Sequence, residues 1–150
     1  MRAMRSSRVR VNKEHKRTLT SLCRLKGLNF EQHTVTTSDG YRLKVFHIWH
    51  RSRRGPPVFF QHGLASAGDT WMVNGDKAPA FMAAKKGYDV WIGNNRGTRH
   101  SRGHRWLDAT RDKKYFDYSF YELGKYDAPA QIDFVRRKTR RNKIAYIGHS

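Results

Sequence analysis

Apolar and polar positions alternate over two neighbouring segments of the chain and predict a β-hairpin. Residues 32–37 and 41–49 follow the two-residue period of strands with one buried face, and the apolar positions of the second segment include Tyr41, Leu43 and Val45. Asp39 and Gly40 lie between the segments, and an Asp-Gly pair is a strong hairpin signal because its turn needs positive φ angles. We therefore expect two antiparallel strands, with ordered structure beginning at Phe30.

Short apolar runs then replace this alternation. Residues 58–60 and 88–92 are runs without a polar period, which are typical of strands buried on both faces of a parallel sheet. Residues 79–86 predict a helix between them, ended by Gly87 where a left-handed residue is favoured. Residues 143–147 predict a third strand. The succession of strand, helix, strand, helix and strand implies right-handed crossovers and a parallel sheet.

The second crossover helix carries its own boundary signals. Ser119 and Glu122 have the spacing of a capping box, and Asp127 is expected to cap a further helix. The apolar side chains of this helix that would face the sheet are those of Ile132 and Val135. The basic residues 136–138 would lie at its C-terminal end, where the helix dipole favours cations, which gives this run a structural explanation.

Composition limits the class of protein. The chain has 150 residues, of which 37% are hydrophobic and 13% aromatic, so it can bury a core and is not of disordered composition. A doubly wound α/β enzyme usually needs more chain than this, so the sequence is either a small complete domain or part of a larger one. Cys23 is the only cysteine, which excludes an intrachain disulfide, and no stretch approaches the roughly 20 apolar residues of a membrane span.

Charge is the most unusual bulk property. The chain has 31 Lys and Arg against 12 Asp and Glu, a formal net charge of +19, which favours anionic partners such as nucleic acid, acidic phospholipid or a fatty-acid product. The excess gathers in residues 1–17 and 136–143, and a solvated surface explains either cluster as well. The Arg-rich start resembles a mitochondrial transit peptide or a frayed basic tail and lacks the apolar stretch of a secretory signal, so no compartment is assigned.

One candidate for chemistry follows the strand predicted over 58–60. His62 and Gly63 let the chain turn sharply and present the next backbone N–H, that of Leu64, to a ligand. In acyl transfer such a preorganised N–H stabilises the oxyanion of the tetrahedral intermediate. The alternative is a simple strand-to-helix turn with a buried His62 that is hydrogen-bonded to the backbone.

The second candidate follows the last predicted strand. Gly148, His149 and Ser150 match the first three positions of the nucleophile elbow G-x-S-x-G, in which the serine lies on a strained turn with its Oγ exposed above the sheet. A bare G-x-S occurs often by chance. The preceding apolar strand and the upstream His-Gly pair favour the catalytic interpretation, because the fold prescribes the oxyanion loop before the nucleophile.

These segments together resemble the acid lipase family, that is, the gastric, lingual and lysosomal lipases and their relatives. The shared motifs are DGY, QHGL, GYDVW, GNxRG, KYDxPAxIDF and GHS, and the similarity runs from Phe30 to Ser150 without a major gap. The resemblance implies an α/β fold class, the N-terminal part of an α/β-hydrolase with a β-hairpin, parallel strands, crossover helices and an incomplete sheet. It divides the ordered chain into a lipase-associated region over 28–57 and a hydrolase core over 58–150. Residues 1–27 are predicted to be a flexible basic leader with a short helix around 19–25.

The resemblance also implies an activity. The family hydrolyses lipid esters through an acyl-enzyme without a cofactor or a metal, so Ser150 is expected to be the nucleophile and Leu64 to supply one oxyanion-hole N–H. The supporting residues are His62, Gly63, Gly148 and His149. The GNxRG motif is expected to shape the top of the sheet through Asn94, Arg96 and Gly97. Asp127 is expected to be a cap, and Asp133 to face solvent or pack.

The triad acid and base follow the serine in this fold, so we expect the chain alone to be an inactive N-terminal fragment. His100 and His104 have an i,i+4 spacing that can bind zinc, but they lack a third ligand and are expected to be loop histidines. The expected partners are a lipid ester and an anionic lipid surface. The alternative is a non-catalytic basic module for nucleic acid or an anionic membrane; nucleic acid is disfavoured because the basic residues are not interleaved with aromatic ones.

Overall fold

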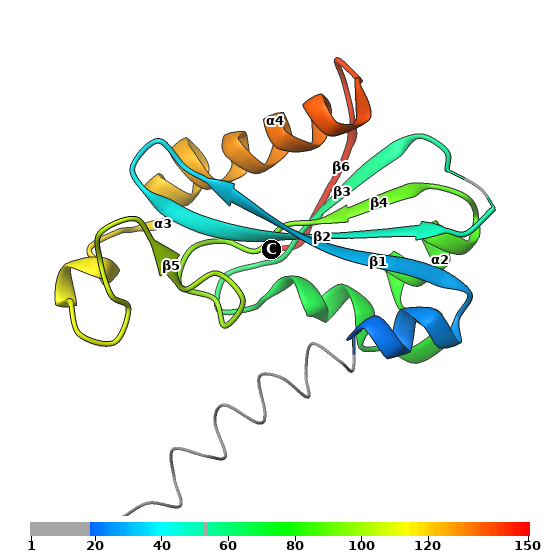
Figure 1. Cartoon of the computed structure of the whole chain (residues 1–150), viewed down its shortest axis with the longest axis horizontal. Coiled ribbons are helices and arrows are strands. Elements are labelled where there is room, and N and C mark those ends of the chain that lie inside the picture. Colours follow the sequence, from blue (N-terminus) through cyan, green and yellow to red (C-terminus); the bar gives the residue numbers. More distant parts are fainter. Residues whose placement is uncertain (1–18, 53) are drawn as a thin grey trace, which may run out of the picture.

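A mixed β-sheet organises the chain, which a computed structural model describes over residues 19–52 and 54–150 (Figure 1). The strand order is β1-β2-β4-β3-β6, and a short β5 pairs with β2. The strands are β1 (Leu28–Thr36), β2 (Tyr41–His50), β3 (Pro57–Gln61), β4 (Asp89–Ile92), β5 (Gly103–His104) and β6 (Ala145–Gly148). β3 runs parallel to both β4 and β6, whereas β2 is antiparallel to β1 and β4. The predicted hairpin and parallel core are both confirmed, within one continuous sheet.

The hairpin differs from its prediction in its start and its turn. β1 begins at Leu28, four residues before the predicted strand. The turn closes through the backbone N–H of Gly40, which donates to Thr37 O at 3.0 Å, and Gly40 has a positive φ of 101°. Asp39 has no positive φ, so the turn is a type I turn followed by one left-handed glycine. The Asp-Gly signal was therefore correct about the hairpin, but only the glycine needs the left-handed conformation.

The short helix expected around residues 19–25 is present, and the leader predicted over 1–27 is therefore not flexible there. Residues 1–18 lie outside the described part of the chain, but residues 19–25 are helical and pack on the domain. Leu19 is 5% exposed and Cys23 is fully buried, and both belong to the core beside Phe46 and Phe81. Ordered structure thus begins before Phe30, because these two side chains bury apolar surface one helical turn apart.

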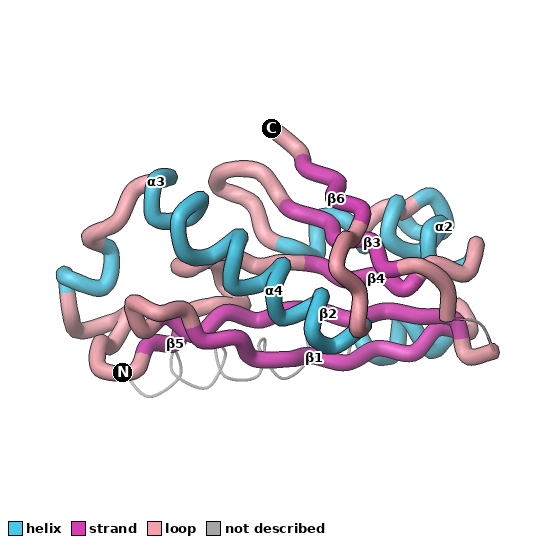
Figure 2. Tube along the Cα trace, turned by 90° about the horizontal axis from the view of Figure 1, so that it is seen from above, coloured by secondary structure: helices cyan, strands magenta, loops and turns pink. Residues whose placement is uncertain are grey.

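Helices cover both faces of the sheet (Figures 1 and 2). α2 (Pro79–Lys85) packs on one face, where Phe81 and Ala84 meet apolar side chains of β2, β3 and β4. As predicted, α2 is followed by a left-handed glycine, Gly87, with a φ of 95°. α4 (Ala128–Thr139) lies on the other face, and its Val135 packs in a second cluster with Phe59 and Trp91. The sheet is therefore the middle of three layers, as in other α/β proteins.

The segment before α4 corrects another prediction. Ser119 forms the predicted capping box with Glu122 at the start of α3 (Phe120–Glu122). The helix then continues through a π-helical turn, Leu123–Asp127, directly into α4. Asp127 has helical φ and ψ angles of −70° and −53° and makes no side-chain cap. It is not a cap because its carboxylate is fully buried and bound by an arginine from another loop.

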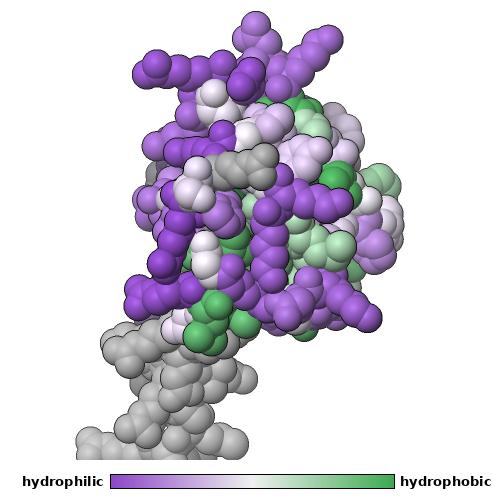
Figure 3. Space-filling view, turned by 90° about the vertical axis from the view of Figure 1, so that its right-hand side faces the viewer, coloured by the Kyte–Doolittle hydropathy of each residue, from purple (hydrophilic) through white to green (hydrophobic). Residues whose placement is uncertain are grey.

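The surface reflects the composition. The face shown in Figure 3 is dominated by hydrophilic side chains with small hydrophobic areas between them. β6 forms an edge of the sheet, and Tyr146 and Ile147 on it are 50% and 42% exposed. Unpaired strand edges with exposed apolar side chains favour association with further strands. In the described part of the chain, no helix is long and apolar enough to cross a membrane.

Candidate active site

The two candidate segments meet because they follow neighbouring parallel strands. β3 and β6 are paired in register, with Gln61 opposite Gly148, so the chain leaves both strands at the same edge of the sheet. The backbone N–H of His149 donates to Gln61 O at 3.2 Å and extends this pairing by one residue. This pairing places residues 62–64 next to residues 148–150.

Gly63 is in direct contact with the second segment. A Cβ atom placed on Gly63 would lie 2.8 Å from the Cβ of Ser150 and 2.9 Å from the carbonyl oxygen of His149. Carbon atoms do not approach this closely without a shift of the backbone, so any side chain at position 63 would push the two loops apart. The glycine therefore allows the main chain before Leu64 to lie against the serine.

Both segments turn through left-handed backbone. Ser150 has a φ of 65°, and Ala65, just after Leu64, has a φ of 57°. Non-glycine residues in this region are uncommon and cost about 1 kcal/mol or more each. A nucleophile elbow places its serine in such a strained conformation at the end of a parallel strand.

His62 holds the first segment in place. It is buried, its Nδ1 lies 2.8 Å from Gly63 O, and its Nε2 accepts the backbone N–H of Asn95 at 3.1 Å. These partners assign the proton to Nδ1, since a carbonyl only accepts and an N–H only donates. Burial lowers the pKa of the His62 imidazole, although the hydrogen bond to Gly63 O opposes that shift. His62 is thus a neutral positioning residue with both ring nitrogens engaged, as the simpler sequence interpretation expected.

The loop after β4 supports the same edge of the sheet. Asn94 is fully buried; its Oδ1 accepts the N–H of Gly68 at 2.8 Å and its Nδ2 donates to Lys44 O at 2.9 Å. Its own N–H donates to Oε1 of Gln131 on α4 at 2.9 Å. Asn94 therefore joins β2, the loop after Leu64 and α4, which agrees with the expectation that GNxRG shapes the top of the sheet.

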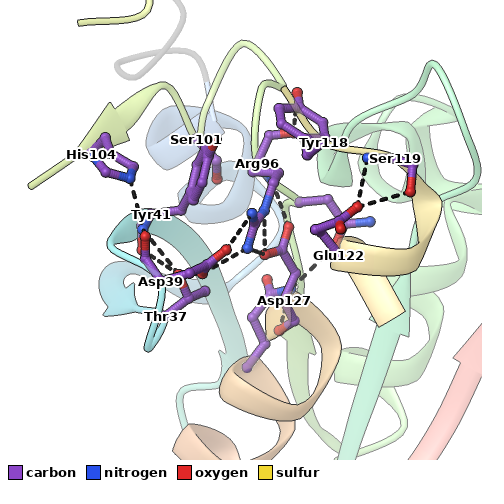
Figure 4. A network of polar contacts seen from close by, with 12 residues as sticks. Thr37, Asp39, Tyr41, Arg96, Ser101, His104, Tyr118, Ser119, Glu122 and Asp127 are labelled. Carbon is purple, nitrogen blue, oxygen red and sulfur yellow. Dashed lines mark hydrogen bonds and ion pairs between the residues drawn. The ribbon is translucent and has the colours of Figure 1, made fainter. Parts of the chain in front are cut away.

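Arg96 lies at the centre of a buried ionic network (Figure 4). Its Nε donates to Asp127 Oδ1 at 2.8 Å, and its Nη1 and Nη2 donate to the carboxylate of Asp39 at 2.7 and 2.9 Å. Its guanidinium stacks over Tyr41, 3.8 Å from the ring centroid. The backbone N–H of Arg96 also donates to Asp127 Oδ2 at 2.8 Å. One side chain thus connects the hairpin turn, the loop after β4 and the start of α4.

The two carboxylates of this network differ in environment. Burial alone would raise the pKa of Asp39, but hydrogen bonds from Arg96 and Thr37 outweigh burial and lower it. Burial raises the pKa of Asp127 despite its bonds to Arg96, because Asp127 has no exposed surface. The sequence placed Asp39 in the hairpin turn and predicted that Asp127 caps a helix. Neither aspartate was predicted to bind Arg96. A usable signal was that the DGY and KYD motifs each contain an aspartate and the GNxRG motif an arginine, which are charges of opposite sign.

A cavity of about 560 Å³ opens between the segment that follows β3 and the loop that follows β4. Its wall includes Leu64, Asn95 and Tyr118. The volume lies within the range of small-molecule sites, and Leu64 is itself 81% exposed at the rim. The loop that contains Leu64 therefore borders a space that can hold part of a ligand.

The remaining predicted residues lie apart from this edge or at the surface. His100 lies 3.4 Å from Asp69 and packs on Phe46, whereas His104 contacts the Asp39 carbonyl at 3.2 Å, so the two histidines have different surroundings. Asp133 forms an exposed ion pair with Arg136 at 2.9 Å, as expected for a solvent-facing residue.

A buried histidine–carboxylate pair exists, but it lies at the other end of the sheet. His47 Nε2 is 2.7 Å from Asp89 Oδ1. Asp89 is the first residue of β4 and is paired with Pro57 at the start of β3, whereas Ser150 follows the end of β6. This pair cannot act as base and acid for Ser150.

Comparisons with known proteins agree with this arrangement. The family described as a partial alpha/beta-hydrolase lipase region matches residues 19–75, and the alpha/beta hydrolase fold family matches residues 56–150. The chain is 37% identical to the human lipase member K and to the lysosomal acid lipase/cholesteryl ester hydrolase of Macaca fascicularis, over 93% of its own length and 37% of theirs. It is 35% identical to the gastric triacylglycerol lipase of Bos taurus, over 95% of its length and 38% of that lipase. The chain therefore spans little more than a third of these relatives.

Solved structures show the same fold at lower identity. A putative lipase from Sulfolobus solfataricus superposes with a TM-score of 0.63 at 16% identity, over 83% of this chain and 38% of that one. A Pyrococcus furiosus esterase superposes with a TM-score of 0.59 at 18% identity, over 83% of this chain and 43% of that one. These likenesses concern the fold alone.

Proposed function

Because this chain belongs to the α/β-hydrolase fold family and is similar to lysosomal and gastric acid lipases, we propose that it carries the nucleophile of a lipid ester hydrolase. Ser150 is the proposed nucleophile and the Leu64 N–H one donor of the oxyanion hole. The observation that carries the proposal is the contact of Gly63 with a left-handed Ser150 at the ends of two paired parallel strands.

The proposed reaction uses this contact directly. Ser150 Oγ attacks the ester carbonyl carbon while a base takes its proton, and the carbonyl π electrons move onto oxygen. The Leu64 N–H stabilises the resulting oxyanion, and collapse expels the alcohol, which receives the proton. Water then hydrolyses the acyl-serine by the same steps. One oxyanion-hole donor contributes about 3–4 kcal/mol to such a transition state.

The base is proposed to come from outside the described residues. His62 has both ring nitrogens engaged, and the His47–Asp89 pair lies at the other end of the sheet. In this fold the acid and the base follow the serine. We therefore expect the 150-residue chain alone to hydrolyse esters no faster than the uncatalysed reaction, and turnover by the purified chain would contradict this.

The test is ester hydrolysis by the protein as its native cells make it. Ser150→Ala is expected to lower kcat by at least about 10³-fold on short-chain nitrophenyl esters and emulsified triacylglycerol. Ser66→Ala is the matched control, because Ser66 lies two residues after Leu64 and its hydroxyl contacts only Thr70, at 2.6 Å. Full activity in Ser150→Ala, or equal losses in both variants, would overturn the assignment.

A second candidate function, binding to an anionic surface, rests on a separate observation. Four arginines line an exposed groove of about 440 Å³ at the C-terminal end of α4, namely Arg136, Arg137, Arg140 and Arg141. Such a groove attracts phosphate or carboxylate groups. Co-sedimentation with phosphatidylserine vesicles should weaken as salt is raised and with the charge-reversal variant Arg137→Glu/Arg141→Glu. Binding that is independent of salt would refute this function, and tighter binding to RNA than to vesicles would favour the basic module.

A further inference from the structure

Three potential metal ligands converge on the α4 face of the sheet, on β1 and β2, whereas Ser150 follows β6 at the opposite edge of the sheet. Glu31 and His33 lie two residues apart on β1 and so share one face, and His47 of β2 is paired directly with Glu31. Glu31 Oε2 lies 3.4 Å from His33 Nε2 and 3.9 Å from His47 Nδ1. One ligand atom from each of the three side chains lies within 4.8 Å of the other two.

The two imidazoles present unused ring nitrogens to this point. His33 Nε2 and His47 Nδ1 are buried and have no hydrogen-bond partner. Buried polar atoms are nearly always satisfied, so two such nitrogens side by side require an explanation. His47 is only 1% exposed, which leaves water little access to its ring.

Asp89 holds the His47 ring in an orientation that suits metal binding. Its Oδ1 lies 2.7 Å from His47 Nε2, which leaves the other ring nitrogen, Nδ1, facing Glu31. Asp89 is itself held by the indole N–H of Trp91 at 2.9 Å and by Arg54 Nε at 3.1 Å. A carboxylate behind a histidine is the usual support of a metal-binding imidazole.

The rings are also held rigidly by aromatic packing. His47 stacks on Trp91 with a centroid distance of 3.7 Å and an interplanar angle of 6°, and on Trp49 at 4.3 Å. His33 packs against Trp91 at 5.5 Å and against Phe134 of α4 at 5.4 Å.

We propose that Glu31, His33 and His47 form a binding site for a divalent transition-metal ion, with zinc as the expected occupant. Two imidazoles and one carboxylate are ligands that Zn²⁺ accepts, whereas Mg²⁺ and Ca²⁺ prefer oxygen alone. Zn–N and Zn–O bonds are about 2.0–2.2 Å, so tetrahedral ligand atoms lie roughly 3.3–3.5 Å apart. The observed 3.4 and 3.9 Å approach this spacing, and Glu31, whose side chain is 56% exposed, can make the small adjustment.

The site would be structural and independent of ester hydrolysis. The metal would join β1 to β2 and, through Asp89, to β4, whereas Ser150 follows β6 at the opposite edge of the sheet. Water can complete its coordination from the exposed side of Glu31. Two cations oppose metal binding, Arg54 at 3.4 Å from His47 Nε2 and Lys138 of α4 near His33, so neutralising Lys138 should strengthen it.

The experiment uses the tag-free chain, stripped with a chelator and titrated with Zn²⁺ by calorimetry and with Co²⁺ by visible absorption. The wild-type chain is expected to bind one ion and to show the intense d–d bands of tetrahedral Co²⁺. Glu31→Gln and His33→Gln should each weaken Zn²⁺ at least about 10-fold, and Asp89→Asn about 10- to 100-fold. Lys138→Gln should increase the affinity for Zn²⁺.

His50→Gln is the matched control, since His50 ends the same strand as His47 but contacts Ser52 instead of the cluster. Because His47 is buried, its replacement can impair folding, so the exposed Glu31 and the partly exposed His33 provide the decisive variants. The proposal is overturned if the wild-type chain binds no Zn²⁺ at micromolar concentration. It is equally overturned if the double variant Glu31→Gln/His33→Gln binds as tightly as the wild-type chain, which would place any zinc elsewhere.

Discussion

The Arg96 network makes a prediction about stability that can be worked from the structure. Arg96→Met removes a guanidinium whose side chain is 1% exposed and leaves Asp127, which is 0% exposed, without its ionic partner. Removing one member of a buried ion pair costs about 3–5 kcal/mol of unfolding free energy, because the other charge stays buried. Asp39 adds little to this loss, since its side chain is 27% exposed and water can replace the lost bonds.

The size of the loss should depend on pH in a defined direction. Asp127 keeps the backbone N–H of Arg96 but loses the positive charge, so its pKa, which burial already raises, rises further in the variant. A folded-state pKa above the unfolded value means that the native state binds the proton more readily, so stability falls as pH rises. The difference between variant and wild type should therefore be larger at about pH 8 than at about pH 5.

The assay is urea unfolding followed by tryptophan fluorescence, with two comparison variants. Arg136→Met breaks the ion pair between Arg136 and Asp133, whose side chains are 43% and 50% exposed, respectively. This variant should lose less than about 0.5 kcal/mol of unfolding free energy. Arg96→Lys keeps the charge and should lose less than Arg96→Met. The reasoning is refuted if Arg96→Met costs no more than Arg136→Met, or if its deficit grows on acidification.

Three further predictions concern single positions. Gly63→Ala should lower the kcat of the protein from its native cells at least about 10-fold, because the new Cβ would lie 2.8 Å from the Cβ of Ser150. Gly124→Ala should change kcat little, since a Cβ at Gly124 has no atom within 4 Å. Equal effects of the two substitutions would contradict the close approach of Gly63 to Ser150. Cys23, fully buried with a pKa raised by burial to about 12, should react with a disulfide reagent only after unfolding in guanidinium chloride; rapid labelling of the native chain would show that the helix over residues 19–25 is not packed as described. His62 has a lowered folded-state pKa, so the unfolded state binds more protons below about pH 6.5 and stability falls on acidification; His62→Gln should reduce this slope in urea midpoints, and an unchanged slope would mean that His62 does not stay neutral.

Most of the fold could be predicted because its signals are local. The alternation at Tyr41 and Leu43, the apolar run before Gln61 and the glycine after α2 each report on neighbouring residues, and the structure has the corresponding elements. The errors have the opposite origin. Asp127 looks like a cap from its neighbours, but its partner Arg96 is 31 residues away.

The functional residues also fall into those that local sequence signals could predict and those that depend on distant pairing. His62, Gly63 and Ser150 could be proposed together because strand ends can be located from the sequence, and parallel strands bring their ends together. The cluster of Glu31, His33 and His47 could not be found, because it depends on the antiparallel register that places Glu31 opposite His47. A shift of one residue in that register would turn one of the two strands over and remove the cluster.

The central claim, that Ser150 is the nucleophile, is tested most directly by covalent labelling. The protein made by its native cells would be treated with a fluorophosphonate, digested, and the modified peptide identified by mass spectrometry. The account predicts one phosphonylated residue, Ser150, with labelling lost in Ser150→Ala and retained in Ser66→Ala. Phosphonylation of a different serine, or ester hydrolysis that persists while Ser150 stays unmodified, would contradict it.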